Sequence, residues 1–327
     1  MEFQNILSPI NPDLEEVEYE LEINIKSPVP LVYEISKYLL GSGGKRLRPS
    51  VLLLSSGACD LTGGRERIFS AAALELIHAA TLLHDDVVDE ANLRRGKTAS
   101  NVVWGNKATV LVGDFMLARA LGLIQSCESL ELIKAVTDAA AKLAEGQVLE
   151  VMSAKNMLEV SEEICFGIIE NKTASLIESC GTVGAILAGA DDEVKRSLGQ
   201  YGFNVGVAFQ LVDDALDYSS SEREFGKGVG QDLVEGKMTL PLFYSLKEAS
   251  DRERLGVNDI LSNGDCFKED ELSFIRELVE KYSGVEKTKT VARNFVHKAR
   301  SSISSLPDNT FKNALGMLAD YVVERKN

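Results

Sequence analysis

The chain is short of several residue types, and each shortage excludes a class of protein. Among its 327 residues there are only 7 prolines, 1 tryptophan and 3 histidines. Scarce proline favours long helices, because proline removes a backbone donor and breaks a helix interior. Scarce histidine argues against a ferritin-type di-metal bundle. That fold needs a Glu-x-x-His pair on each of two helices, and the three histidines do not supply two such pairs.

The 5 cysteines are scattered and show no CxxC spacing. Their number is odd, and the first residues, MEFQNILSPINPDLEEVEYELE, lack the basic start and apolar core of an export signal. We therefore expect a reduced, cytoplasmic protein. Uncharged stretches such as residues 179–190 are shorter than the ~20 residues that cross a bilayer. No transmembrane segment is expected, and peripheral membrane contact stays open.

The charge balance argues against a nucleic-acid partner. The chain has 35 Lys and Arg against 50 Asp and Glu, a net charge of −15. Phosphate backbones attract basic surfaces and not acidic ones. An anionic small molecule could still bind, but only through local clusters of Lys and Arg or through bridging metal ions.

Apolar residues recur at helical spacing along almost the whole chain, and strand-like alternation is scarcely visible. Hydrophobic residues make up 45% and charged residues 26%, which is the balance of a globular protein. No linker or change of composition divides the sequence. We therefore predict an all-α fold, a single large helical bundle that occupies residues 1–327 as one domain. The clearest stripe is Ile68, Ala72, Leu76, Ala79 and Leu83.

Two predicted helices, residues 108–124 and 172–190, are apolar on more than one face. A helix of this kind must be covered by other helices or by a second subunit. The first of them indicates a homodimer interface.

Two segments carry a DDxxD pattern at the C-terminal end of an apolar helical run: HDDVVDE at 84–90 and FQLVDDALD at 209–217. Residues four apart share a helix face, so Asp85 points the same way as Asp89, and Asp213 the same way as Asp217. Like charges at this spacing repel and, near a helix C-terminus, oppose the helix dipole. One such cluster could be a solvated helix end, but two favour a bound cation. Mg²⁺ fits, because it takes a few carboxylates together with substrate phosphates.

Basic residues lie beside loops near these aspartates, as a phosphate-bearing substrate requires. Arg offers a planar fork that matches phosphate oxygens, and Lys offers a mobile point charge. Each segment alone is typical of a solvated surface, but the set predicts phosphate binding. The segments are GGKRLRP at 43–49, LRRGK at 93–97, KT at 172–173, FGKG at 225–228 and EGKMT at 235–239.

The histidines allow more than one interpretation. His78 lies seven residues before Asp85, two turns away on about the same helix face. It is either a core residue or a phosphate contact. His84 adjoins the first cluster and could orient it, whereas His297 lies in a polar helix and is expected at the surface.

Together these features resemble the trans-isoprenyl diphosphate synthase family over nearly the whole chain. In detail they look most like its long-chain, octaprenyl-type members. The resemblance implies an isoprenoid-synthase bundle with a central active-site cavity, a Mg²⁺ cofactor and a homodimer. The matching segments, in the family's order and spacing, are GGKRLRP (43–49), ELIHAATLLHDDVVDE (75–90), NLRRGK (92–97), WGNKATVLVGDFMLARA (104–120), ENKTASL (170–176), GVAFQLVDDALDY (206–218) and FGKGVGQDLVEGKMTLPL (225–242).

The resemblance also implies residue roles. Asp85, Asp89 and Asp213 would bind Mg²⁺, with Asp217 as a further candidate. Asp86 and Asp214 would complete the catalytic aspartate clusters, together with Lys172 and Lys237. The diphosphate of isopentenyl diphosphate would be held by Lys45, Arg48, His78 and Arg95. The allylic diphosphate would be held by Arg94, Lys172, Thr173, Gln210, Lys227 and Lys237.

In such an enzyme the allylic C–O bond ionises while metal and basic residues stabilise the leaving diphosphate. The double bond of isopentenyl diphosphate attacks the resulting carbocation, and a proton is then lost. No side-chain nucleophile is required, and the released diphosphate can act as the base. Apolar walls exclude the water that would quench the cation.

Product length would depend on the helix that carries Asp85. In the family that the chain resembles, members that make short products carry a bulky aromatic residue four or five positions before the first aspartate. Here those positions hold Thr81 and Ala80, so the floor near the site is open. An eight-unit product is ~40 Å long, about 25 helical residues. We expect a product near C40, with a floor formed by residues such as Ile77, Leu74 or the 115–116 region.

Three other functions remain as alternatives. A synthase of shorter products, C15 to C20, shares the same chemistry. A non-catalytic partner subunit would lack one aspartate cluster, and both are intact here. A terpene cyclase usually carries an Asn/Ser/Glu metal motif in place of the second DDxxD.

Replacing Ala80 by Phe should shorten the product, because the aromatic ring would close the open floor next to Asp85. Chromatography of the dephosphorylated products of the variant and of the unaltered enzyme measures the change. An unaltered product length in the Ala80→Phe enzyme would rule out the open floor.

Overall fold

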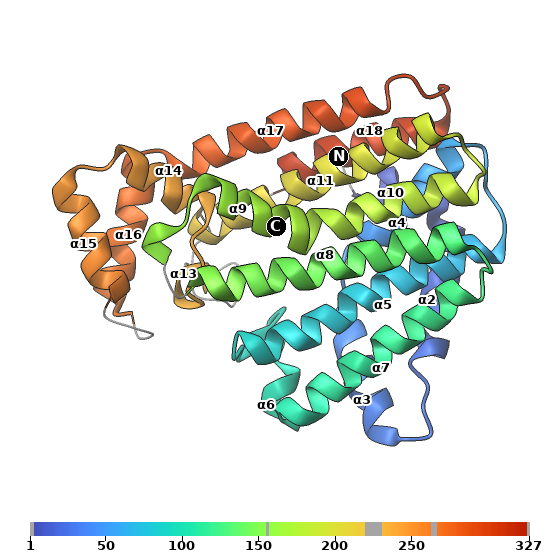
Figure 1. The fold of residues 1–327 in the computed structure, drawn as a ribbon, viewed down its shortest axis with the longest axis horizontal. Coiled ribbons are helices and arrows are strands. Elements are labelled where there is room, and N and C mark those ends of the chain that lie inside the picture. Colours follow the sequence, from blue (N-terminus) through green and yellow to red (C-terminus); the bar gives the residue numbers. More distant parts are fainter. Residues whose placement is uncertain (1–2, 155–156, 220–230, 263–266, 326–327) are drawn as a thin grey trace. The chain divides into compact units, whose positions relative to one another are not determined.

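The structure, a computed structural model, describes residues 3–154, 157–219, 231–262 and 267–325 (Figure 1). In these residues it is almost wholly α-helical, which confirms the predicted fold class. Contacts group the chain into two compact units. The first comprises residues 1–140, 176–202 and 302–318, and the second residues 141–175, 203–301 and 319–327. A single domain over the full length stays a prediction.

The first unit is built around one long buried helix, α5 (Arg65–Val88), which packs against α2, α4 and α7. The predicted stripe from Ile68 to Leu83 is buried, with no member more than 4% exposed. The other elements that contribute to this unit are α1 (Phe3–Ile6), η1 (Ser8–Ile10), α2 (Asn11–Asn24), α3 (Pro30–Leu40), α4 (Leu47–Ala58), α6 (Ser100–Trp104), α7 (Asn106–Gln125) and parts of α8 (Leu130–Ala154), α10 (Ser175–Leu187), α11 (Asp192–Ser219) and α18 (Thr310–Glu324).

The second unit contains the rest of α8 and α11 and the helices around them. Within it α14 packs against α9 and α16, and α15 packs against α16. Ser161 caps α9, because its side chain accepts from the Ile164 N–H. The elements are η2 (Met157–Glu159), α9 (Glu162–Ile168), η3 (Ile169–Ala174), α13 (Gln231–Val234), α14 (Leu240–Glu248), α15 (Asp251–Ser262), α16 (Glu269–Lys281) and α17 (Gly284–Ser302).

Two local features differ from the sequence predictions. The chain forms a small antiparallel hairpin, β1 (Leu93–Arg94) with β2 (Lys97–Thr98), in which Leu93 pairs with Thr98. Residues 172–187 are helical without a break, but the first of them belong to a π-helical turn, η3, and α10 ends at Leu187, before residue 190. The predicted helix 108–124 is present within α7.

By length and composition alone, α7 could also cross a membrane, and it is the one such helix among the described residues. Core helices of soluble proteins meet the same test. Two charged side chains of α7 contact other helices. Asp114 lies 3.4 Å from His84 of α5, and Arg119 donates to the Asn24 side chain of α2 at 2.9 Å. These contacts place α7 within the fold of the first unit.

Candidate active site

The first aspartate cluster forms the C-terminal end of α5. Asp85 lies in its last turn, and the Asp89 N–H donates to the Asp85 carbonyl at 2.8 Å, so helical geometry continues through both. Both side chains are half-buried, whereas Asp86 between them is fully buried. The two outer aspartates therefore remain accessible and the middle one is enclosed by protein.

The partner of Asp86 comes from the hairpin that the sequence did not reveal. Arg94 donates from Nε to Asp86 Oδ1 at 2.6 Å, and Nη2 lies 2.6 Å from the same oxygen. A buried carboxylate needs such a partner, because an uncompensated charge away from water costs several kcal/mol. The hairpin turns at Arg95 and Gly96, both with positive φ, as a two-residue hairpin loop requires. Arg94, predicted to contact the allylic diphosphate, thus holds the middle aspartate.

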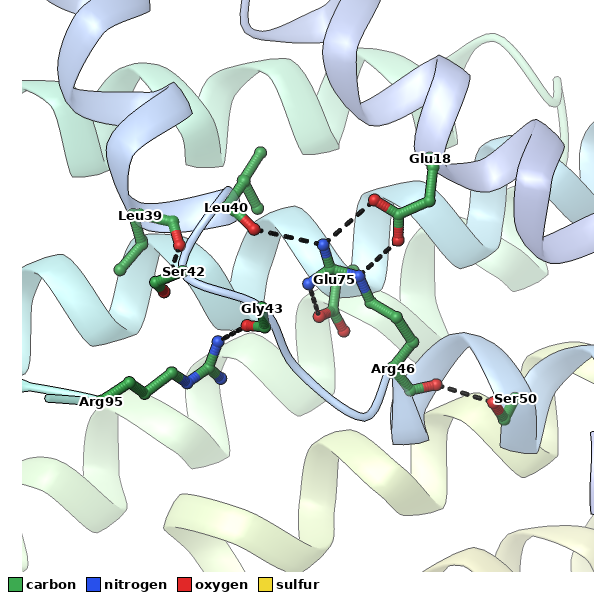
Figure 2. A network of polar contacts seen from close by, with 9 residues as sticks. All are labelled: Glu18, Leu39, Leu40, Ser42, Gly43, Arg46, Ser50, Glu75 and Arg95. Atoms are coloured by element: carbon green, nitrogen blue, oxygen red, sulfur yellow. Dashed lines mark hydrogen bonds and ion pairs between the residues drawn. The ribbon is translucent and has the colours of Figure 1, made fainter. Parts of the chain in front are cut away.

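Two further arginines fix the Gly-rich loop between α3 and α4 (Figure 2). Arg95 donates to the Gly43 carbonyl. Arg46 joins two helices: Nε lies 2.5 Å from Glu18 Oε1 on α2, and Nη1 lies 3.1 Å from Glu75 Oε1 on α5. The sequence showed Arg46 only as one cation among three in the loop. Its position between two carboxylates could not be read from a local pattern.

Four arginines of the first unit lie close enough to His78 to act on its charge. Burial lowers the pKa of His78 well below its usual value, and four guanidinium groups lower it further, so the ring is neutral at pH 7. Such a concentration of cations repels itself, and a bound diphosphate would relieve the repulsion. Lys45 is half-buried in the loop before α4. The four arginines are Arg48, Arg95, Arg94 and Arg46.

The predicted chain-length residues lie on α5 just before the aspartates. Ala80 is 2% exposed and Ile77 is 1% exposed. Thr81 is half-buried, and its hydroxyl donates to the His78 carbonyl at 2.8 Å. His84 also belongs to this helix and lies 3.2 Å from the Val110 carbonyl of α7. It therefore links the end of α5 to α7. His297 is exposed, as predicted.

The second aspartate cluster repeats the arrangement of the first at the end of α11. Asp213 and Asp217 are half-buried, and Asp214 is 4% exposed. Asp214 accepts a hydrogen bond from Gln210 Nε2 at 2.9 Å, and Gln210 Oε1 accepts one from the Thr173 hydroxyl at 2.9 Å. Burial raises the pKa of Asp214 to about 7. The hydrogen bond from Gln210 acts in the opposite direction and lowers the pKa, but burial is the larger effect. Nearby positive charge would return this carboxyl to its ionised form.

A residue near the C-terminus pairs with the outer aspartate Asp213. Arg325 Nη2 lies 2.5 Å from Asp213 Oδ1 and donates to the Phe209 carbonyl at 2.9 Å. The guanidinium also stacks on the Phe209 ring, 3.9 Å from its centroid. Nothing in the local sequence around Arg325 predicted this contact, because it joins residues more than a hundred positions apart.

Two of the predicted lysines, Lys172 and Lys237, share a carboxylate that was not predicted. Lys172 Nζ lies 2.5 Å from Glu150 Oε2, and Lys237 Nζ lies 3.9 Å from the same oxygen. Lys237 also lies 2.6 Å from Glu235. Asp232 was missed as well: its backbone N–H donates to Asp217 Oδ2 at 3.2 Å. Lys172 and Lys237 thus each lie next to at least one acidic side chain.

The donor set of each cluster fits Mg²⁺. Among the residues that the structure describes, no three His, Cys, Asp or Glu side chains converge into a ready-made metal site. Each cluster instead offers two half-buried carboxylates in one unit. Mg²⁺ is usually bound in this way, by one or two carboxylates with the remaining positions taken by water and substrate phosphates. Lys227 lies outside the described residues.

A cavity of about 420 Å³ lies in the second unit, but it contains none of the predicted site residues. The central active-site cavity stays a prediction. The lining residues are Tyr244, Glu286, Lys287, Thr290 and Val291.

Comparisons with known proteins agree with the fold. The family model described as polyprenyl synthetase matches residues 29–279. Octaprenyl diphosphate synthase of Haemophilus influenzae is 36% identical over 325 residues, covering 99% of this chain and 98% of the relative. Geranylgeranyl diphosphate synthase of Saccharolobus solfataricus is 35% identical over 327 residues, covering 97% of each chain.

A solved structure is also closely similar. The polyprenyl synthase of Caulobacter crescentus, complexed with calcium and isoprenyl diphosphate, has a TM-score of 0.95 at 34% identity. The match covers 100% of this chain and 98% of that one.

An all-α fold with two DDxxD helix ends and a basic cluster defines a prenyltransferase of the isoprenoid-synthase class. The chain belongs to the polyprenyl synthetase family. It is a polyprenyl diphosphate synthase, which condenses isopentenyl diphosphate onto an allylic diphosphate.

Replacing His78 by Gln should make the stability of the protein less sensitive to acid. The folded-state pKa of His78 lies below the value of the unfolded chain, ~6.5. As the pH falls below that value, the unfolded chain binds a proton that the folded chain does not, so the free energy of unfolding falls. Above it the two states bind equally.

Urea denaturation at pH 5, 6 and 7 measures this effect. Between pH 6.5 and 5, the free energy of unfolding should fall less steeply in His78→Gln than in the unaltered protein. The two slopes should differ by up to about 1.4 kcal/mol per pH unit. Equal slopes for the two proteins would contradict a neutral His78.

Proposed function

We propose that this synthase uses Mg²⁺ and makes a long all-trans product, near C40. The arrangement of the two DDxxD helix ends carries the proposal. In each, a middle aspartate is held by protein while two outer aspartates stay half-buried on one helix face. Relatives named for long products match the chain over nearly its full length, as the Haemophilus influenzae enzyme does.

The outer aspartates are assigned to the metal. Asp85 and Asp89 of the first unit would bind Mg²⁺, and so would Asp213 of the second. When bound, Mg²⁺ supplies positive charge to the departing diphosphate. Asp86 and Asp214 act by positioning, because each is buried and already hydrogen-bonded to a side chain of the protein.

The two diphosphates are assigned to different basic groups. Isopentenyl diphosphate is held in the first unit, where the neutral ring of His78 can donate one hydrogen bond without adding charge. The allylic diphosphate is assigned to a second group, in which Lys172, Thr173 and Lys237 contact carboxylate or amide oxygens of the protein in this structure. The first group is Lys45, Arg48, His78 and Arg95. The second is Lys172, Thr173, Gln210 and Lys237, with Arg94 and Lys227.

Product length is assigned to the face of α5 before Asp85. Ala80 and Ile77 are both buried, and neither is aromatic. No aromatic ring at these positions would therefore block the growing product beside α5. A relative named for a shorter product, the Saccharolobus solfataricus enzyme, matches the chain at similar identity. Overall identity therefore does not determine the length, and the α5 positions carry this part of the proposal.

The protein is proposed to act in the cytoplasm as a homodimer. The face of α7 that carries Leu111, Ala118 and Leu121 is exposed, and Leu111 is 66% exposed. Large apolar side chains on one exposed helix face are typical of a surface covered by another subunit. A non-catalytic partner subunit is not favoured, because both aspartate clusters have accessible outer carboxylates.

Incubation with Mg²⁺, labelled isopentenyl diphosphate and farnesyl diphosphate should yield a ladder of products that ends near C40. Asp85→Asn should lower kcat by on the order of 10²-fold, because one carboxylate that holds the metal is lost. The exposed Asp138, changed to Asn, is the matched control and should keep full activity.

Products that stop at C20 would overturn the proposed length and leave the chemistry intact. Full activity after Asp85→Asn, or full activity in the presence of EDTA, would overturn the metal assignment. No elongation with farnesyl, geranyl or dimethylallyl primers would point to a partner subunit.

A further inference from the structure

A π-helical turn carries two of the residues assigned to the allylic diphosphate. Between α9 and α10 the backbone widens into η3, residues Ile169–Ala174, which includes Lys172 and Thr173. π-helical turns are rare and occur mostly as single insertions at functional sites. An α-helix advances about 100° per residue, so one inserted residue redirects every side chain that follows it.

The turn sends neighbouring side chains to two different helices. Lys172 Nζ reaches Glu150 of α8 at 2.5 Å. The next residue, Thr173, is 8% exposed, and its hydroxyl donates to Gln210 of α11 at 2.9 Å. Gln210 in turn donates to the buried Asp214. The widened backbone therefore connects a lysine and the second aspartate cluster through two adjacent residues.

Two glycines let these helices come close to the turn. A Cβ on Gly146 of α8 would lie 2.5 Å from the Lys172 backbone nitrogen and 2.8 Å from Asn171 Cβ. A Cβ on Gly206 of α11 would lie 2.6 Å from Ala174 Cα. Neither glycine has positive φ, so space and not backbone conformation excludes a side chain. Backbone atoms cannot swing aside as the tip of a flexible side chain can.

We propose that Gly146 and Gly206 are positioning residues. They let α8 and α11 pack against the π-helical turn, and this packing fixes the directions of the Lys172 and Thr173 side chains. A methyl group at either position would force the turn away from α8 or α11. Lys172 and Thr173 would then leave the geometry in which they hold a diphosphate. The inference rests on the proposed function, because it takes Lys172 and Thr173 as ligands of the allylic diphosphate.

A third glycine provides a matched control close to the same turn. Gly167 lies in α9, and a Cβ there would meet only Leu149 Cδ2 at 3.4 Å, an ordinary contact. Alanine is favoured over glycine in a helix interior. Gly167→Ala should therefore fold as well as the unaltered protein or better, and it should bind both substrates normally.

Calorimetry of binding tests the proposal without relying on catalysis. The probes are isopentenyl diphosphate and the unreactive thio analogue of farnesyl diphosphate, each in the presence of Mg²⁺. In Gly146→Ala and Gly206→Ala the Kd of the farnesyl analogue should rise about tenfold. The Kd of isopentenyl diphosphate, assigned to residues of the first unit, should change less than twofold. Gly167→Ala should change neither, and circular dichroism confirms that each variant is folded.

A double-variant comparison separates positioning from general packing. If Gly146 acts through Lys172, then adding Gly146→Ala to Lys172→Ala should weaken farnesyl-analogue binding much less than the single change does. The corresponding pair for Gly206 is Gly206→Ala with Thr173→Val. This second pair keeps the test possible if Gly146→Ala does not fold.

The outcomes distinguish the proposals. Three results would overturn the role of the glycines but not the proposed function. They are unchanged binding in folded variants, equal weakening of the binding of both ligands, and additive effects in the double variants. Failure of the unaltered protein to bind either diphosphate would overturn the proposed function, and the positioning role with it.

Discussion

Each aspartate cluster buries its middle carboxylate, and a buried carboxylate must find a partner within the protein. Asp86 finds it in Arg94, and Asp214 finds it in Gln210. Removing such a partner would leave an uncompensated charge or force protonation. The burial of these two groups therefore determines which other segments must lie at the helix ends.

The partners connect each aspartate cluster to residues that we propose bind phosphate groups. Arg94 belongs to the hairpin that also carries Arg95, and Arg95 contacts the Gly-rich loop that precedes Arg48 (Figure 2). In the second unit, Gln210 joins Asp214 to Thr173, which lies next to Lys172. In both units the inner aspartate is therefore connected, through its hydrogen-bond partner, to a segment that carries basic residues. In the proposed assignment, folding and binding thus use different members of the same motif.

Much of this could be predicted from sequence, because helical spacing determines which side chains share a face. The stripe of α5 and the shared face of Asp85 and Asp89 follow from a repeat of 3.6 residues. The outer aspartates and His78 were selected in this way, and the basic segments by their place beside loops near the aspartates. Their roles stay predictions. The magnesium cofactor, the dimer and the central cavity are proposals that rest on the resemblance and the donor set.

The rest could not be predicted, because it depends on contacts between distant residues or on irregular backbone. Glu150, Arg46 and Arg325 gain their partners only when separate helices meet. The π-helical turn has no repeat that marks it, and residues 172–190 therefore read as one helix. The different roles of inner and outer aspartates also require burial, which the DDxxD pattern does not contain.

A crystal structure with Mg²⁺ and the unreactive farnesyl analogue would test directly whether the outer aspartates bind metal while the inner aspartates stay bound to protein. We expect metal ions bound by Asp85, Asp89 and Asp213, with Asp86 still hydrogen-bonded to Arg94 and Asp214 still hydrogen-bonded to Gln210. Metal ions bound by Asp86 or Asp214, with Arg94 or Gln210 released, would contradict this expectation.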